Sequence, residues 1–406
     1  MSKRPRILML TTQLGYGGAE TSFIRLANFL AQSMEVTVAL FTADYGHGAR
    51  YAQGHEPLHA PIVLLDAASP QPRLLRWARR IGRMRALKRQ HDVTISFLPG
   101  SNLVNVLAGH NRHSVISLRG SRKFDPVSAP WQRRLFQYML DPMMYALAAR
   151  IVPVSHGLTH EIRASGLPKV IDKVRVISPF IERATIAARL KEPPPEVFAA
   201  LRGQPVIVAA GRLSVEKGFH HLIRVVAAVA KAQAGVKLLL IGDGPMLGAL
   251  RGQCASLGLA VDNHEAGVSA VIFAGYQQDV LPLMKLGCIY AMSSATEGFP
   301  NVLLEAMAVG LPVIAADTPW GVRSILCATP SETAEPYPTQ TATVAEFGTL
   351  MPRIDRPEYE SIWCEALGAA LATPPAISTA TAQRPYDFDL AVVGEKWKTL
   401  LAECEG

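Results

Sequence analysis

The sequence contains little cysteine, and its cysteines do not form a recognisable group. There are five, scattered along the chain, with no Cys-x-x-Cys pair. This pattern argues against a metal site or a disulfide framework and favours a reducing, cytoplasmic compartment. No apolar run reaches the ~18 residues that a membrane-spanning helix needs. The apolar run at residues 7–10 is also shorter than the ~7–15-residue core of a signal peptide, so we interpret it as the first strand.

Charge is sparse as well. Charged residues make up 18% and hydrophobic residues 49% of the 406 residues, which is typical of a globular protein. Strand-like apolar runs alternate with helix-like segments in two similar halves, which predicts an α/β fold. A segment ending in three prolines, 182–195, separates the halves. We expect a first domain at 1–180, a linker at 181–202, a second domain at 203–385 and a terminal helix within 386–406.

One stretch of the second half has the features of a ligand-binding edge. Apolar runs at 288–292 and 312–316 are predicted as buried strands, and Pro300 and Asn301 begin a short helix between them. In a parallel sheet, this arrangement puts the helix N-terminus at the carboxyl ends of the strands, where such sheets bind ligands. The amides of Asn301 and Val302 would suit a phosphate.

Two glutamates flank this predicted anion position. Glu297 lies in the loop before the helix, and Glu305 lies one turn inside it. Because a carboxylate is a bidentate acceptor for a diol, the pair suits a ligand with hydroxyl groups, such as a sugar on one side and a ribose on the other. The alternative is a pair of solvated helix-surface glutamates, but the Gly-Phe-Pro-Asn insert at 298–301 favours a binding site.

Two cations bracket another predicted loop. Strand 205–210 leads into the loop 211–218, which contains Arg212 and Lys217 and precedes a helix. Two cations at the end of a strand and beside a helix N-terminus suit a diphosphate leaving group, and plain surface charge is the alternative. The spacing of a P-loop, Gly-x4-Gly-Lys-Ser/Thr, is absent.

The first half gives weaker signals. Gly17 and Gly18 stand in a turn between a strand and a helix, where glycines let the backbone approach a ligand, but they do not form a dinucleotide fingerprint. Arg119 follows strand 114–118 and suits a phosphate-bearing acceptor or leaving group; a structural ion pair is an equal alternative. We expect His156 to be a satisfied turn residue.

The stretch from Glu297 to Glu305 resembles the Glu-x7-Glu signature of the retaining glycosyltransferases of family 4, which have the GT-B fold. The loop 211–218 is similar to the family's Gly-Arg-Leu…Lys-Gly motif. The turn 317–323 is similar to its Asp-x-Pro-x-Gly-x-Arg-Glu-Ile turn, although Ser324 replaces the glutamate. The resemblance covers most of the chain.

The resemblance weakens in one region and carries clear implications for the fold. It is weakest between about Ser324 and Tyr386, where a Thr/Pro-rich insertion at 327–346 has no readable role. The GT-B fold implies two Rossmann-like, doubly wound α/β domains that face each other across a cleft. It also implies that the terminal helix packs back on the first domain.

The resemblance further implies retaining glycosyl transfer from a nucleotide-sugar, expected to be a UDP-sugar, with no metal ion and no cofactor. Arg212 and Lys217 would take the place of a divalent cation, Glu297 would orient the sugar and Glu305 would hold the ribose. In many relatives a histidine contacts the substrate where Arg119 stands here. The expected substrate-binding residues are Gly17, Gly18, Arg119, Gly244, Tyr276, Gly298, Phe299, Pro300, Asn301, Val302 and Glu305.

A basic segment bears on the acceptor. Residues 73–89 hold eight cations and no acid, with apolar residues at helical spacing. In a protein of this family we interpret the segment as a helix that binds an anionic membrane surface; the alternative is a solvated helix whose apolar stripe packs on the core. Nucleic-acid binding is not expected, because aromatic residues are not interleaved beyond Trp77.

The expected protein is therefore a cytoplasmic, peripheral enzyme at the inner face of the cell membrane. It would transfer a hexose or N-acetylhexosamine to a lipid-linked or cell-envelope polysaccharide or lipopolysaccharide acceptor. Two alternatives remain open. One is a soluble transferase that acts on a small phosphorylated acceptor, and the other is a non-catalytic nucleotide-sugar-binding subunit.

Overall fold

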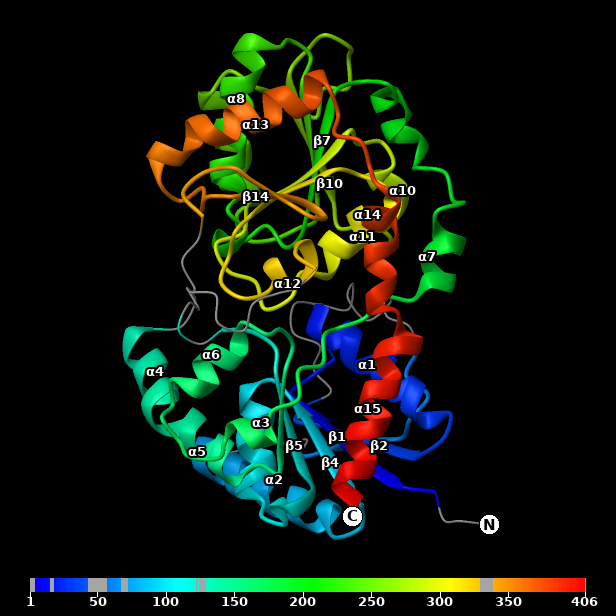
Figure 1. The fold of residues 1–406 in the computed structure, drawn as a ribbon, viewed down its shortest axis with the longest axis vertical. Coiled ribbons are helices and arrows are strands. Elements are labelled where there is room, and N and C mark those ends of the chain that lie inside the picture. The colour runs from blue at the N-terminus through cyan, green and yellow to red at the C-terminus, as the bar shows by residue number, and fades with distance from the viewer. Residues whose placement is uncertain are drawn as a thin grey trace. The chain divides into compact units, whose positions relative to one another are not determined.

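The computed structural model describes residues 4–14, 18–42, 57–66, 72–121, 123, 129–328 and 339–405. The chain divides into two compact units. Unit 1 consists of Met1–Phe180 with Leu390–Gly406, and unit 2 consists of Ile181–Asp389. Each unit has its own, mostly parallel sheet with helices on both faces (Figure 1). The predicted architecture of two Rossmann-like α/β domains is confirmed.

The sheet of unit 1 is parallel throughout, with the strand order β3-β2-β1-β4-β5-β6. The order reverses between β1 and β4, and sheets of this kind bind ligands at the carboxyl ends of the strands beside such a reversal. The strands are β1 (Arg6–Thr11), β2 (Glu35–Leu40), β3 (Ile62–Leu64), β4 (Val93–Phe97), β5 (Ser114–Leu118) and β6 (Arg150–Pro153).

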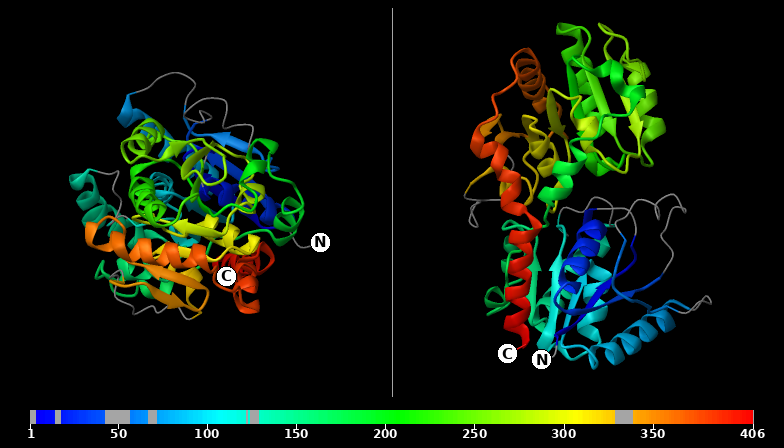
Figure 2. Two further views of the ribbon diagram at one scale, coloured as in Figure 1. Left: turned by 90° about the horizontal axis from the view of Figure 1, so that it is seen from above. Right: turned by 90° about the vertical axis from the view of Figure 1, so that its right-hand side faces the viewer.

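Helices cover both faces of this sheet because its strands are apolar on both sides. Along β1, Ile7 and Met9 pack toward α1 and α15, whereas Leu8 and Leu10 pack toward α2 and α3. Figure 2 shows α15 and α2 on opposite sides of the sheet. The helices are α1 (Gly18–Ala31), α2 (Arg73–Lys88), α3 (Pro99–Leu107), η2 (Asn111–His113), α4 (Pro130–Leu135), the π-helical η3 (Phe136–Leu140), α5 (Asp141–Leu147), α6 (Leu158–Arg163), η4 (Ile171–Lys173) and α15 (Leu390–Glu405).

The terminal helix α15 belongs to the core of unit 1. Trp397 is 2% exposed and stacks on Phe97 of β4, with ring centroids 6.2 Å apart. Gly394 lies against the ring of Phe29 on α1 so closely that a Cβ at this position would overlap the ring. The end of the chain therefore completes the core that the first strands begin.

The sheet of unit 2 has the order β13-β14-β12-β11-β7-β8-β10-β9, and only the β13–β14 pair is antiparallel. Its order reverses between β7 and β11, which predicts a ligand site at the carboxyl ends of these two strands. The strands are β7 (Val206–Ala210), β8 (Lys237–Ile241), β9 (Ala260–Val261), β10 (Ala270–Gly275), β11 (Ile289–Met292), β12 (Val313–Ala316), β13 (Thr343–Ala345) and β14 (Gly348–Met351).

The helices of unit 2 also form two layers. Val206 and Val208 of β7 pack toward α11, whereas Ile207 and Ala209 pack toward α8 and α13. The helices are α7 (Arg183–Arg189), η5 (Glu196–Leu201), η6 (Val215–Lys217), α8 (Phe219–Ala232), α9 (Leu247–Ser256), α10 (Leu281–Met284), α11 (Asn301–Val309), α12 (Arg323–Leu326), η7 (Pro357–Tyr359), α13 (Glu360–Ala372), α14 (Thr379–Gln383) and η8 (Arg384–Phe388).

The segment predicted as a linker is largely helical. Both α7 and η5 lie within residues 181–202, and the whole segment belongs to unit 2. Residues 190–195 between these helices lack regular structure, and the consecutive prolines at 193–195 cannot donate backbone hydrogen bonds.

Helix α2 forms where the basic segment predicts a helix, but its cations do not all face solvent. Lys88 is 5% exposed, and its ammonium donates to oxygens of Asn105 and Ser114. Burial lowers the pKa of Lys88 to about 7. Arg80 forms a bidentate ion pair with Asp66 at 2.6 Å. Fewer cations are therefore available to an external partner than the sequence suggests.

Candidate functional site

Two loops meet where the strand order of unit 2 reverses. The loop after β7 leads into α8 and the loop after β11 leads into α11. The amide of Ala295 donates to the carbonyl of Glu216 at 2.7 Å, and Ser293 Oγ donates to the carbonyl of Lys217 at 2.9 Å. Gly218 has a φ of +67°, and a Cβ there would overlap the carbonyl oxygen of Ser293. The approach of the two backbones thus requires glycine.

Lys217 and Glu297 form an ion pair across these loops. Lys217 Nζ lies 2.6 Å from Glu297 Oε1, and the two side chains are only 22% and 12% exposed. Sequence reasoning identified both residues but not their pairing, because 80 positions separate them. A charge-assisted bond in a partly buried setting is stronger than a solvated surface pair. One edge of the sheet thus presents a cation and a carboxylate together.

The Glu297 loop is held from its other side by the turn that follows β12. The backbone of Glu297 pairs with that of Trp320. A Cβ at Gly321 would lie 2.7 Å from the carbonyl oxygen of Gly298 and 2.9 Å from Cα of Phe299. Backbone packs directly on backbone here, so any side chain at position 321 would displace the Glu297 loop.

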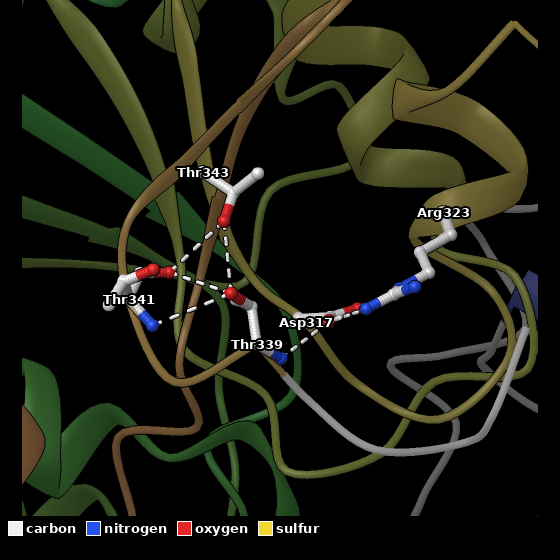
Figure 3. Close-up of polar contacts among 5 residues, drawn as sticks. All are labelled: Asp317, Arg323, Thr339, Thr341 and Thr343. Atoms are coloured by element: carbon white, nitrogen blue, oxygen red, sulfur yellow. Dashed lines mark hydrogen bonds and ion pairs between the residues drawn. The ribbon is translucent and has the colours of Figure 1, made fainter.

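A buried carboxylate anchors this turn in its place. Asp317 is 3% exposed and accepts hydrogen bonds from the Arg323 guanidinium at 2.8 and 2.5 Å and from the Thr339 amide at 2.8 Å (Figure 3). The Thr339 hydroxyl contacts Thr341 and Thr343 in the same cluster. Because bonds to a buried carboxylate are strong, they restrict where the donors can lie. The described end of the Thr/Pro-rich insertion therefore braces the candidate site, a role that its sequence did not indicate.

The N-terminus of α11 lies where the sequence predicts an anion position. The first amides of a helix have no intrahelical acceptor, and Asn301 Oδ1 is buried without a hydrogen-bond partner in the described part of the chain. Glu297 and Glu305 both lie near the buried hydroxyl of Tyr290. Burial raises the pKa of the Tyr290 phenol, and the charges of these two glutamates raise it further. Polar groups with capacity for a ligand thus gather beside one helix end.

Other predicted residues of unit 2 lie on neighbouring strand ends. Arg212 is exposed and has no carboxylate partner among the residues that the structure describes. Tyr276 follows β10 and is half-buried, and burial raises its pKa. Gly244 lies against the backbone of Leu213, whose nitrogen would be 2.6 Å from a Cβ at this position. This packing by itself requires glycine at 244.

The insert before and at the start of α11 turns its side chains inward. Phe299 packs edge-to-face against Phe388, with ring centroids 5.3 Å apart. Pro300 is buried, and Val302 packs against the same core. The backbone of this segment and the Asn301 side chain are therefore the polar groups available to a ligand.

The predicted residues of the first half lie in unit 1. Gly18 begins α1, and Gly17 lies outside the described residues. Arg119 follows β5, and its guanidinium lies over the ring of Phe97 at 4.6 Å. Within the described residues no carboxylate forms an ion pair with Arg119. Burial lowers the pKa of Arg119 to about 10, although the nearby charge of Glu20 acts to raise it.

Two general features bear on the chemistry. Across the described ranges, no group of three or more His, Cys, Asp or Glu side chains has the arrangement of a metal site. No described helix combines the length and the apolar character needed to cross a bilayer.

Two family models match the chain and together cover most of it. The model for Glycosyltransferase Family 4 matches residues 16–184, and the model for Glycosyl transferases group 1 matches residues 204–337. The chain belongs to the group 1 glycosyltransferases of family 4. The predicted family is therefore confirmed.

Parts of this glycosyltransferase are similar in sequence to curated relatives. The lipopolysaccharide core biosynthesis glycosyltransferase LpsE of Rhizobium meliloti is 35% identical over 144 residues, which are 35% of this chain and 37% of LpsE. The 2-deoxystreptamine glucosyltransferase of Streptomyces kanamyceticus is 31% identical over 141 residues, which are 33% of this chain and 34% of that protein. The matched stretches thus span about a third of the length of these relatives.

A solved structure matches this glycosyltransferase over nearly its whole length. HepE of Anabaena, crystallised in complex with UDP and glucose, has a TM-score of 0.73 at 20% identity, and the match covers 98% of this chain and 99% of HepE. At this identity the likeness shows the fold, and the predicted GT-B fold is confirmed.

Replacement of Gly321 tests whether the turn after β12 positions the Glu297 loop. We expect Gly321→Ala to push the loop away, because the new Cβ would lie 2.7 Å from the Gly298 oxygen. Such overpacking costs about 1–3 kcal/mol of stability, and we expect turnover of the nucleotide-sugar to fall about tenfold or more. The measurements are the melting temperature and the rate of sugar release from the donor.

The matched control is Gly252→Ala on α9, where an added Cβ meets no atom within 4 Å. This variant should keep full activity. If Gly321→Ala is as active as the control, the turn does not position the loop.

Proposed function

We propose that this glycosyltransferase moves a hexose or N-acetylhexosamine from a UDP-sugar to a lipid-linked or cell-envelope polysaccharide or lipopolysaccharide acceptor. The transfer retains the anomeric configuration and uses no metal ion. The observation that carries the proposal is the Lys217–Glu297 ion pair at the strand reversal of unit 2. A cation for the departing diphosphate and a carboxylate for the sugar hydroxyls occupy the place where sheets of this kind bind nucleotides.

The proposed reaction breaks the bond between the anomeric carbon and the diphosphate and forms a bond to the acceptor oxygen on the same face. Arg212, Lys217 and the amides at Asn301 stabilise the negative charge that develops on the leaving group. The departing phosphate takes the proton of the acceptor hydroxyl, so no separate protein base is required. Glu297 orients the sugar, and Glu305 holds the ribose.

The relatives support both the donor and a choice of acceptors. HepE is a neighbour with UDP and glucose bound, which supports a UDP-sugar donor. LpsE is named for lipopolysaccharide core biosynthesis, which supports an envelope acceptor. The 2-deoxystreptamine glucosyltransferase supports the alternative of a soluble, small acceptor. Exposed apolar and basic side chains at the start of α2 favour the envelope acceptor.

Helix α2 begins with side chains suited to a membrane surface. Leu74 and Leu75 are 85% and 59% exposed, and Arg73 and Arg76 beside them are exposed as well. Apolar side chains flanked by cations bind at an anionic lipid interface. Trp77 and Leu87 further along α2 pack against the core, so the exposed leucines of this helix lie in its first turn.

Donor choice is tested by thermal shift with UDP-, GDP- and ADP-sugars. A ligand at ~100 times its dissociation constant adds ~2.7 kcal/mol of stability, and we expect this only with a UDP-sugar. NMR of the transferred sugar should show the same anomeric configuration as the donor. Stabilisation by another nucleotide-sugar alone, or inversion in the product, would contradict the proposal, and binding without turnover would indicate a non-catalytic subunit.

The two cations are tested by Arg212→Ala and Lys217→Ala. Each change should lower turnover roughly a hundredfold, as the loss of one oxyanion donor does, because each removes charge from the leaving-group site. Arg202→Ala and Lys231→Ala are matched controls at exposed positions of unit 2 and should remain active. Near-normal turnover in both test variants would rule out the diphosphate role.

The glutamates are distinguished by calorimetry with UDP and with the UDP-sugar. Glu305→Ala should weaken the binding of both ligands, since a hydrogen bond to a charged group contributes ~1.5–3 kcal/mol. Glu297→Ala should spare UDP and impair only the sugar-dependent step. Equal losses of UDP affinity in the two variants would contradict this division.

Membrane binding is tested by co-sedimentation with vesicles. We expect binding to anionic but not neutral vesicles and release by high salt, since each cation contributes ~1 kcal/mol and screening sets in within ~10 Å at 0.1 M salt. The double variants Leu74→Ser/Leu75→Ser and Arg73→Gln/Arg76→Gln should no longer bind the anionic vesicles. Arg80 is left unchanged because it pairs with Asp66.

The control for charge is Arg202→Gln/Lys231→Gln in unit 2, which should bind the vesicles normally. Equal recovery of the native protein in the supernatant with both vesicle types would favour a soluble acceptor.

A further inference from the structure

A pocket lies at the carboxyl edge of the unit 1 sheet, on the side where the strand order reverses. It is formed by the ends of β4 and β5 and the starts of α1, α5 and α6, and its volume is about 260 Å³. Pockets for drug-sized ligands measure about 300–1,000 Å³, so this one suits a single sugar ring. Its lining includes Ser117, Arg119, Asp141, Met144, Tyr145 and Glu161.

Arg119 lines this pocket, and the nearby charge of Glu20 favours its cationic form. In the described part of the chain its guanidinium donates to no carboxylate or carbonyl and lies over the ring of Phe97, at 4.6 Å. Phe97 is itself fixed by the stack with Trp397. The aromatic support orients the side chain but leaves its N–H donors unused. Arg119 is partly buried, so its guanidinium has lost part of its hydration, and no hydrogen bond within the described residues replaces it, which points to an anionic ligand.

Ser117 adds an independent sign of a ligand. The side chain is fully buried, it lines the same pocket, and its hydroxyl has no hydrogen-bond partner among the described residues. Buried hydroxyls are normally paired, so one that has no partner in the described ranges and lines the same pocket as Arg119 indicates a ligand that the protein alone lacks.

The pocket also contains groups that would repel a bare anion. Asp141 and Glu161 line it, and Glu161 accepts a hydrogen bond from Ser121 Oγ. Carboxylates accept hydrogen bonds from sugar hydroxyls, and the apolar surface of Met144 and Tyr145 suits the face of a sugar ring. The site therefore favours a ligand with hydroxyl groups at one end and negative charge at the other.

We propose that this pocket binds the acceptor sugar and that this sugar carries an acidic group, a phosphate or a carboxylate, which Arg119 and Ser117 hold. The inference rests on the proposed function, because it specifies the acceptor of the same reaction. It makes Arg119 a specificity-determining residue of the acceptor and not a ligand of the donor diphosphate.

The test is calorimetry on the full chain with glucose 6-phosphate, glucuronate and methyl glucoside as probes, and with UDP and inorganic phosphate alongside. The acidic sugars should bind at least tenfold more tightly than methyl glucoside and inorganic phosphate. Arg119→Gln should remove this preference, since it deletes a charged hydrogen-bond donor set, and should leave UDP affinity unchanged. Ser117→Ala should weaken the binding of the acidic sugars by a smaller factor than Arg119→Gln does. Arg112→Gln, at an exposed position of the same unit, is the matched control and should bind as the native protein does.

Several outcomes would overturn the proposal. Equal binding of neutral and acidic sugars would remove the role of the charge, and equal binding of inorganic phosphate would show an anion site without sugar recognition. Weaker UDP binding by Arg119→Gln would assign the arginine to the donor. If Arg119→Gln does not fold, Arg119→Lys and Ser117→Ala are measured in its place. Both must then reduce the preference for acidic sugars over methyl glucoside. If no UDP-sugar stabilises the protein, the proposed donor is wrong. The binding of acidic sugars in the unit 1 pocket is then still decided by the calorimetry with the acidic and neutral sugars.

Discussion

The ion pair between Lys217 and Glu297 joins two loops that follow adjacent strands, and the candidate donor site depends on that connection. Around it, backbone packs on backbone at Gly218 and Gly321, so neither loop has room to move independently. Asp317 then fixes the turn behind Glu297 through Arg323 and Thr339. Electrostatic stabilisation of a leaving group needs donors that are already in place, and this arrangement supplies such order before any ligand binds.

Unit 1 holds its cation in a different way. Arg119 lies on an aromatic ring, and a tryptophan from α15 supports that ring, so the last helix of the chain helps to position a residue at the end of β5. An arginine held by aromatic contacts keeps its hydrogen-bonding capacity for a ligand, whereas one held by a carboxylate does not. The contrast with the paired Lys217 fits the two roles proposed for these cations, one at the diphosphate of the donor and the other at an acidic group of the acceptor.

Helix α2 shows how far a charge pattern can be interpreted without a structure. Its periodicity predicted the helix correctly, because side-chain spacing along a helix is a local property. Which of its cations pair within the protein and which face solvent was not predictable from the sequence. Lys88 is enclosed by Asn105 and Ser114, and Arg80 pairs with Asp66, so these two cations serve the fold and only the first turn presents cations beside exposed leucines. Burial depends on neighbours from other elements.

By itself the sequence determined the α/β class, most strands and helices, the family, and the loops that carry Arg212, Lys217, Glu297 and Glu305, because apolar periodicity, turn residues and motif spacing are local. Only the tertiary structure decided that Lys217 pairs with Glu297, that the Thr/Pro-rich insertion braces the site through Thr339, and that Arg119 lies over the ring of Phe97. The physical reason is that such contacts depend on which strand ends become neighbours, and the strand order is set by long-range packing of the sheet.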